Sequence, residues 1–244
     1  RTLWLRGGFP PSFLADDDEA SRRWRQSFAR TFLERDIAEL GIRVPSGTIR
    51  RFWTMLAHYH AQLWNGAELA RAFGVGEHAV RGYLDILCDT FMARRLPPWF
   101  QNLAKREVRA PKVFLTDSGV LHHLLGIRDE HELLGHPKVG ASFEGFAIQQ
   151  VVRLLDAQDE ECFSWGLHGG AELDLLFVRG ARRIGFEIKH SSAPKVTSSM
   201  RSALEQLELE RIDVIWPGDD VFMLGEKIRA VGIGALTRTL LNPP

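Results

Sequence analysis

The sequence predicts an α+β protein, with a helical first half and a second half built on a mixed sheet. Apolar residues recur at helical spacing between Trp24 and Leu63, which indicates amphipathic helices. Between residues 171 and 190, apolar and ionisable residues alternate instead, as they do along strands. The order helix, three strands, helix, strand is typical of an α/β core whose sheet is covered by helices.

Composition places the chain among ordinary globular proteins. Hydrophobic residues make up 45% and charged residues 25%, so a disordered chain is not expected. Lys and Arg total 31 against 31 Asp and Glu, which excludes a uniformly basic nucleic-acid binder but permits a local basic patch. Cys88 and Cys162 lack metal-type spacing, and no signal peptide or apolar run of membrane length is visible. We therefore expect a cytoplasmic chain with no membrane segment, and the start at Arg1 indicates a fragment or a processed chain.

Residues 1–48 are expected to form a helical lead-in. The acidic run 16–18 suits the first turn of a helix, because carboxylates are stabilised at the positive end of the helix dipole. A metal site at this run is the less favoured alternative. Apolar residues then continue at helical spacing from Trp24 to Ile37.

Residues 49–125 are expected to form a winged helix-turn-helix. Asn65 is a good N-cap, and Glu68 three residues later completes a capping-box pattern. The short helix "AELARAF" precedes a glycine turn and a longer helix, "EHAVRGYLDILCD", which is the helix-turn-helix order. The segments "TFMARRLPP" and "PKVFLTD" then read as the two strands of a wing.

The predicted wing is basic. Residues 90–115 hold six basic residues and one acidic residue, a local balance of 6 − 1 = +5 in a neutral chain. The basic residues are Arg94, Arg95, Lys105, Arg106, Arg109 and Lys112. Arg81 adds a charge from the second helix, which offers few side chains for reading bases. We expect weak nucleic-acid binding without sequence preference, and a protein-docking module or a solvated loop is the alternative.

Residues 130–244 are expected to form the α/β domain, and "AELDLLFVRGARRIGFEIKH" (171–190) is its most informative stretch. Strand alternation places Asp174 on the same side as Glu172, and Glu187 on the same side as Lys189. Two adjacent carboxylates repel unless a positive charge lies between them, and Mg²⁺ suits such oxygen ligands. The alternative is the solvated face of a hairpin, where cross-strand Glu–Lys pairs stabilise the sheet without chemistry.

The spacing of these residues resembles the PD-(D/E)xK nuclease superfamily. Asp174 is followed after a gap by Glu187 and Lys189 in a Glu-x-Lys pattern, and Glu144 lies in an upstream helix. The resemblance implies a restriction-endonuclease-like α/β domain with an αβββαβ core. It also implies that these four residues are catalytic and that Asp174, Glu187 and Glu144, assisted by Glu172, bind Mg²⁺ or Mn²⁺.

The whole chain also resembles the C-terminal region of a bacterial and archaeal AAA-type ATPase family of largely unknown function. The segments that carry this resemblance include "LWLRGGFPPSFL", "NGAELARAFGV", "PKVFLTDSGVLHHLLGI", "HPKVGASFEGFAI" and "AELDLL". In that family an N-terminal ATPase module precedes a winged helix and a nuclease-like domain. This chain has no G-x-x-x-x-G-K-[ST] loop, so ATP is expected only on an N-terminal module that the chain lacks.

The resemblances leave three functions of different classes open. The first is a metal-dependent nuclease, in which Lys189 would orient the attacking water. The second is a nuclease-like fold that binds nucleic acid or a partner without catalysis, and the third is an assembly module of the ATPase. Further basic residues could steer a phosphate backbone to the site, and they are Arg179, Arg182, Arg183, Lys195 and Arg201. A homo-oligomer is also compatible with the sequence.

Overall fold

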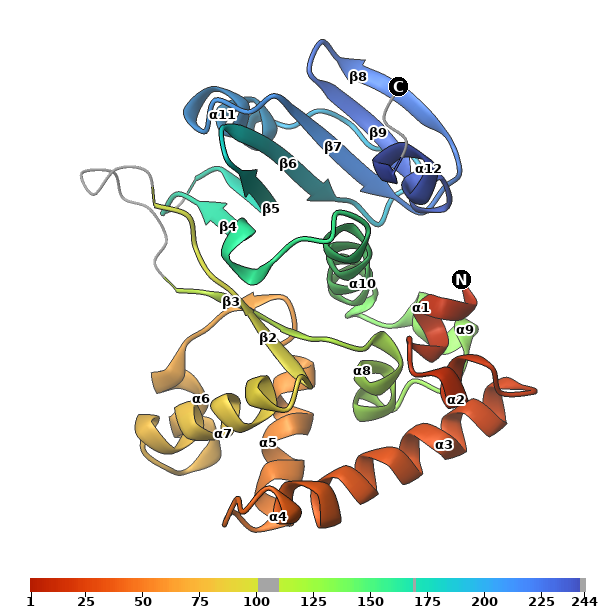
Figure 1. The fold of residues 1–244 in the computed structure, drawn as a ribbon, viewed down its shortest axis with the longest axis vertical. Helices are drawn as coiled ribbons and strands as arrows, with labels where there is room; N and C mark the ends of the chain where they lie inside the picture. The colour runs from red at the N-terminus through yellow and green to blue at the C-terminus, as the bar shows by residue number, and fades with distance from the viewer. Residues whose placement is uncertain (101–109, 169, 242–244) are drawn as a thin grey trace. The chain divides into compact units, whose positions relative to one another are not determined.

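The computed structural model describes residues 1–100, 110–168 and 170–241 and divides the chain into two compact units. The first unit comprises Arg1–Arg95 and Val113–Phe146, and the second comprises Leu96–Lys112 and Ala147–Pro244. Helices dominate the first unit, and a six-stranded sheet forms the centre of the second (Figure 1). This arrangement confirms the predicted α+β class. The division into domains 1–48, 49–125 and 130–244 stays a prediction.

The first unit begins with short helices and one long helix. They are α1 (Thr2–Arg6), α2 (Pro10–Phe13), α3 (Asp18–Thr31), a π-helical turn (Phe32–Asp36) and α4 (Ile37–Glu39). Later in the chain come α8 (Ser118–Leu125), α9 (Glu130–Gly135) and the start of α10 (Val139–Leu154). Buried side chains of α3, α5 (Ser46–His58), α7 (Glu77–Asp89) and α8 share one hydrophobic core in this unit.

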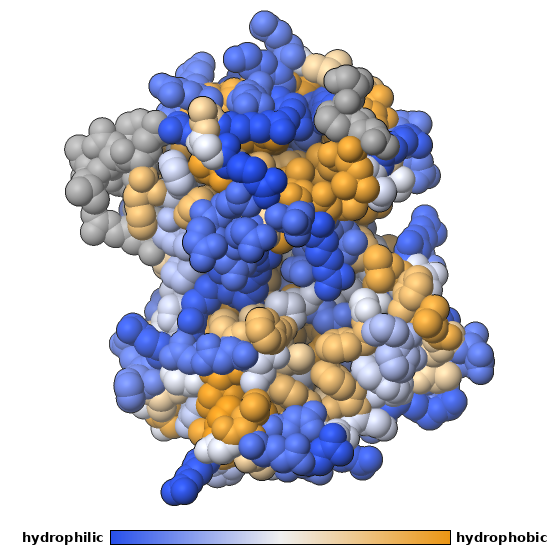
Figure 2. Space-filling view, viewed as in Figure 1, coloured by the Kyte–Doolittle hydropathy of each residue, from blue (hydrophilic) through white to orange (hydrophobic). Residues whose placement is uncertain are grey.

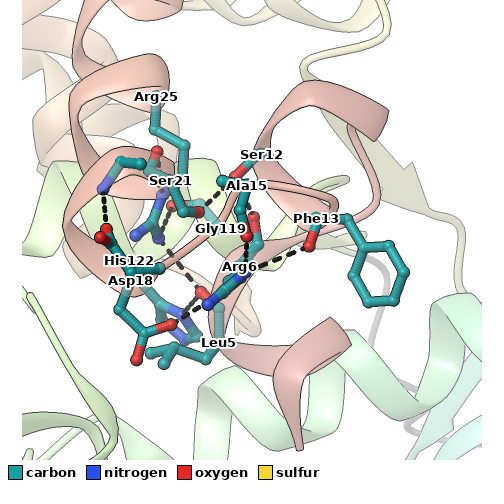
Figure 3. A network of polar contacts seen from close by, with 12 residues as sticks. Leu5, Arg6, Ser12, Phe13, Ala15, Asp18, Ser21, Arg25, Gly119 and His122 are labelled. Carbon is teal, nitrogen blue, oxygen red and sulfur yellow. Dashed lines mark hydrogen bonds and ion pairs between the residues drawn. The ribbon is translucent and has the colours of Figure 1, made fainter.

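The acidic run 16–18 forms a helix start, as predicted. The Asp17 carboxylate accepts a hydrogen bond of 2.6 Å from the amide of Ala20, which caps α3. Asp18 pairs with Arg6 at 2.7 Å and belongs to a polar network that ties α1 and α2 to α3 and α8 (Figure 3). At the centre of this network the buried Arg25 donates hydrogen bonds to the backbone carbonyls of Leu5 and Gly119.

The middle of the first unit has helices and strands in the predicted order, and their identity as a winged helix-turn-helix stays a prediction. Its elements are α5 (Ser46–His58), β1 (Gln62–Leu63), α6 (Gly66–Phe73), α7 (Glu77–Asp89), β2 (Ala93–Leu96) and β3 (Lys112–Leu115). The side chain of Asn65 caps α6 by accepting the amide hydrogen bond of Glu68, and Gly74 ends α6 in the left-handed conformation. The strands form a sheet in the order β1-β3-β2, so the two predicted wing strands are neighbours. The wing residues Lys105, Arg106 and Arg109 lie outside the described residues.

The second unit contains a mixed sheet in the order β4-β5-β6-β7-β9-β8. Its strands are β4 (Cys162–Gly166), β5 (Glu172–Arg179), β6 (Arg182–Ile188), β7 (Arg211–Trp216), β8 (Val221–Gly225) and β9 (Ile228–Gly232). The pairs β6–β7 and β7–β9 are parallel, and the other three pairs are antiparallel. The order α10, β4 to β6, α11 (Ser198–Gln206), β7 is the helix and strand order expected from the sequence.

A β-bulge interrupts the pairing of β4 with β5. Phe163 pairs with Leu176 and Trp165 pairs with Leu173, so two residues of β5 stand opposite Ser164 alone. These two residues are Asp174 and Leu175. Ser164 makes its backbone hydrogen bonds with Pro97 and Trp99 instead. The bulge therefore falls at a residue that the sequence identified as a site candidate.

Helix α11 covers one face of the second unit's sheet. Its buried residues pack with strand residues in one hydrophobic core whose members include Leu173, Leu176, Met200, Ile212 and Val214. Helix α12 (Leu236–Leu241) follows a short 3₁₀ turn (Ile233–Ala235) after β9. On the face seen in Figure 2, hydrophobic side chains reach the surface in several separate groups. Within the part of the chain that the structure describes, no helix is both long and apolar enough to cross a membrane, and the cytoplasmic location stays a prediction.

Candidate functional site

Two carboxylates stand opposite each other on the neighbouring strands β5 and β6. Leu175 pairs with Phe186, and continuation of this antiparallel register places Asp174 opposite Glu187. Asp174 is 6% exposed and Glu187 is 2% exposed. Buried adjacent carboxylates repel each other and lose hydration, so the surrounding groups must compensate for both effects.

The Asp174 carboxylate is held by a backbone amide and by an ammonium. Its Oδ2 accepts a hydrogen bond of 2.9 Å from the amide of Ile188, and its Oδ1 lies 3.0 Å from Nζ of Lys112. The Lys112 side chain is largely buried, so this ion pair is poorly screened by water. Sequence reasoning placed Lys112 among the residues expected to bind phosphate, and it gave no indication of this contact.

The Glu187 carboxylate is satisfied at one oxygen only. Its Oε1 lies 2.6 Å from Nζ of Lys189, whereas Oε2 is buried and has no hydrogen-bond partner among the described residues. Burial, reinforced by the charge of Asp174, raises the pKa of Glu187 from 4.5 to about 7, although Lys189 opposes the shift. Burial alone would lower the pKa of Lys189, but the attraction of Glu187, Asp174 and Glu172 outweighs it and raises that pKa.

The carboxylate oxygens at this site could supply some, but not all, of the ligands of a hard divalent cation. Mg²⁺ is commonly held by one or two carboxylates and keeps several of its waters, and Asp174 and Glu187 offer two carboxylates with one unused acceptor. Glu172, which was predicted to assist the metal ligands, begins β5 and is exposed. No group of three or more His, Cys, Asp or Glu residues suited to a metal occurs within the described ranges of the chain. A cation at this site would therefore rely on water or substrate oxygens for its other ligands.

Glu144, the predicted helical acid, lies in α10. It belongs to the part of this helix that clusters with the first unit, whereas Asp174 and Glu187 belong to the second. Its participation in the same site therefore stays a prediction.

The predicted phosphate-binding residues that the structure describes differ in how they are engaged. Arg81 is exposed on α7, and Arg95 forms an ion pair with Asp85. Arg94 is partly buried on β2. In the second unit, Arg179 pairs with Glu161, Arg182 with Glu210, and Arg183 donates to the carbonyl of Leu207. Most of these side chains therefore have protein partners already, and their binding to a phosphate backbone stays a prediction.

Sequence reasoning missed a second buried acid, Asp213 on β7. Asp213 is fully buried, and Arg229 on β9 donates to both of its oxygens, at 2.6 and 3.1 Å. Arg211 adds longer contacts of 3.2 and 3.3 Å through its Nε. The signal was present, because an aspartate in the middle of the apolar strand "RIDVIW" needs a partner.

Family models match both halves of the chain. A domain of unknown function, DUF8612, matches residues 1–131, and a second domain of unknown function, DUF4143, matches residues 139–236. No solved structure matches the chain.

Two curated mycobacterial proteins are similar to nearly all of the chain. It is 49% identical over 229 residues to the uncharacterized protein Rv2008c of Mycobacterium tuberculosis, and equally to the uncharacterized protein Mb2031c of Mycobacterium bovis. The similarity covers 94% of this chain and 52% of each relative, so the chain spans about half the length of the curated relatives it matches.

Proposed function

The chain belongs to the DUF8612 family of domains of unknown function, and we propose that it carries a metal-dependent phosphodiesterase site for nucleic acid. The observation that carries the proposal is the Glu187 carboxylate. It is 2% exposed, lies beside Asp174, and has one oxygen for which the described part of the chain provides no hydrogen-bond partner. A buried acceptor that the protein leaves unsatisfied costs about 1 to 3 kcal/mol, and a bound cation would offset that cost.

Each residue of the site has a distinct role in this proposal. Asp174 and Glu187 would hold Mg²⁺ or Mn²⁺, which supplies a Lewis acid for the phosphoryl oxygen and a water of lowered pKa. Lys189 lies 2.6 Å from Glu187 and its side chain is 38% exposed, so its ammonium can reach both the carboxylate and a phosphate oxygen. Lys112 forms an ion pair of 3.0 Å with Asp174 and so fixes the orientation of this carboxylate.

We also propose that the chain works as the C-terminal module of an AAA-type ATPase. Two observations support this proposal: the second matched family, DUF4143, is typically found with such ATPases, and the curated relatives are about twice as long as the chain. ATP would then bind to the N-terminal module, and nucleic acid would bind to the wing and the sheet.

A second candidate is a binding module without catalysis. It is favoured by the two ammonium groups of Lys112 and Lys189, which already lie on Asp174 and Glu187. Such pairs can hold a buried acidic cluster together with no metal, and folds of this class do not by themselves imply an activity.

Metal binding separates the two candidates. If the site binds a cation, Mg²⁺ or Mn²⁺ at about 100 times its Kd should raise the Tm of the wild-type chain by several degrees. The variant Glu187→Gln should lose this rise, and without metal its Tm should equal or exceed that of the wild type. Calorimetric titration with each metal gives the affinity directly, and Glu210→Gln, which alters an exposed acid of the same unit, is the control.

Cleavage of labelled single- and double-stranded DNA and RNA should require the same metal and the same two carboxylates. Should neither metal alter the Tm nor support cleavage, the phosphodiesterase proposal fails and the binding module takes its place.

A further inference from the structure

Both oxygens of the Asp174 carboxylate already have partners. Its Oδ2 accepts a hydrogen bond of 2.9 Å from the amide of Ile188, and its Oδ1 lies 3.0 Å from Nζ of Lys112. On Glu187, by contrast, Lys189 contacts only Oε1, and the described residues provide no partner for Oε2. A divalent cation can therefore reach Glu187 through an unused oxygen, whereas at Asp174 it has to share Oδ1 with an ammonium group.

Lys112 is held in its position more firmly than Lys189. The Lys112 side chain is 12% exposed, and the Lys189 side chain is 38% exposed. An ammonium group that water barely reaches has lost most of its hydration, so a neighbouring carboxylate retains it strongly. Lys189 can turn toward water, whereas Lys112 has to leave a buried position before another cation replaces it at Oδ1 of Asp174.

The distance between Lys112 and a cation on Asp174 would be short. Mg²⁺ lies about 2.1 Å from a ligand oxygen, so Mg²⁺ on Oδ1 would be at most about 5 Å from the Lys112 nitrogen in the present geometry. A single and a double charge at this separation repel by more than a tenfold change in affinity represents, even at an effective dielectric constant of about 20. The two ammonium groups also balance the two carboxylates, so a divalent cation would leave the cluster with an excess of positive charge.

We propose that Lys112 is a built-in competitor of the metal, whose ammonium occupies Oδ1 of Asp174 and so lowers the affinity of the site for a divalent cation. This inference rests on the proposed function, because it presupposes that Asp174 and Glu187 can bind a metal. It gives the Lys112 ion pair a role beyond orienting the carboxylate. The metal-free arrangement with two lysines is then the resting state of the site.

Calorimetric titration of the 244-residue chain with Mn²⁺, and separately with Mg²⁺, tests the proposal. Lys112→Met should bind each metal at least about tenfold more tightly than the wild type, because the competing charge is gone. Lys189→Met should give a smaller gain, because Lys189 does not contact Oε2 of Glu187. Lys227→Met is the matched control, since it removes the same charge from an exposed position between β8 and β9, and it should leave the affinity unchanged.

A second variant guards against loss of the fold. Lys112→Met leaves the buried Asp174 without this ammonium, whereas Lys112→Gln keeps a hydrogen-bond donor at the position and removes only the charge. Lys112→Gln should therefore also bind each metal more tightly than the wild type. Far-ultraviolet circular dichroism and the Tm without metal show which variants are folded. A chain that folds with neither residue at position 112 needs the ammonium for its fold, and this outcome overturns the inference.

The remaining outcomes separate this inference from the proposed function. If the wild type binds metal and neither variant of Lys112 binds it more tightly, the inference is wrong and the proposed metal site stands. An equal gain in Lys189→Met or Lys227→Met also overturns the inference, because the effect would then be one of overall charge. If only the Lys112 variants bind metal, the inference holds and the wild-type chain alone is not a metal-dependent enzyme. If no protein binds either metal, both proposals fail.

Discussion

The sheet of the second unit holds two buried acidic groups, and they are satisfied in opposite ways. Asp213 lies between Arg211 and Arg229, and both of its oxygens accept hydrogen bonds from guanidinium groups. Asp174 and Glu187 instead lie beside each other, each with one ammonium, and Oε2 of Glu187 has no partner within the described structure. The first group is complete within the protein, and the second is not.

This difference separates a structural role from a functional one. A buried charge whose hydrogen bonds are all made resists change and specifies packing, whereas an unsatisfied one stores unfavourable free energy that a ligand can release. Both groups sit in apolar strands and look alike in the sequence. The two groups therefore differ in how many cationic side chains contact each carboxylate, and in whether these are lysines or arginines. Each of the following experiments changes these ion pairs or measures what they contribute to stability.

The largest effect is expected at the complete group. Asp213→Asn leaves two guanidinium groups near a neutral amide, and loss of one member of a buried ion pair costs about 3 to 5 kcal/mol. The lower end is expected, because the Arg211 and Arg229 side chains keep some contact with water. Urea unfolding measures the change in the free energy of unfolding. Glu210→Gln, which removes an exposed ion pair with Arg182, should change it by less than about 1 kcal/mol, and equal losses would contradict the comparison.

The incomplete group, Asp174 and Glu187, should make the free energy of unfolding depend on pH. Because the pKa of Glu187 is raised, the folded protein keeps the proton of this residue up to about pH 7, whereas the unfolded chain releases it near pH 4.5. The unfolded state therefore binds fewer protons in this window, and the free energy of unfolding falls as pH rises. The total loss is on the order of 3 kcal/mol, and it should be present in the wild type and absent in Glu187→Gln. Parallel stability curves for the two proteins from pH 4.5 to 7 would refute this assignment.

The smallest effect distinguishes the two arginines around Asp213. Arg229 donates through two nitrogens at short distances, and Arg211 through one nitrogen at longer distances. Charged hydrogen bonds of good geometry contribute about 1.5 to 3 kcal/mol, so Arg229→Met should cost more than Arg211→Met, which we expect to cost about 1 kcal/mol or less. Urea unfolding of the two variants ranks them, and the reverse ranking would show that these distances do not govern the pairing.

Local signals in the sequence predicted much of the fold. Asn65 caps α6 and Gly74 ends it with a positive φ, and both roles follow from residue type and position. Strand alternation likewise located β5 and β6. The π-helical turn Phe32–Asp36 was not predicted, because its residues fit an ordinary α-helix equally well.

The site was less predictable, because its partners come from distant parts of the chain. Asp174, Glu187 and Lys189 were identified from spacing, but Lys112 lies 62 residues from Asp174 and carries no local sign of the contact. The same limit applies to Arg229 and Asp213, which meet only because β9 pairs with β7. Whether Glu144, Glu172 and a metal complete the site stays a prediction.

Because of the bulge at Asp174 and Leu175, the pairing of Asp174 with Glu187 depends on the number of residues in β5. Deletion of Leu175 would give β5 one residue opposite Ser164 instead of two, so β5 could pair with β4 without interruption. Against β6, however, Asp174 would move by one position to stand opposite Phe186, and its side chain would turn to the other face of the sheet. A relative with one residue fewer in this strand would therefore keep every acidic residue and yet lose the pairing of Asp174 with Glu187.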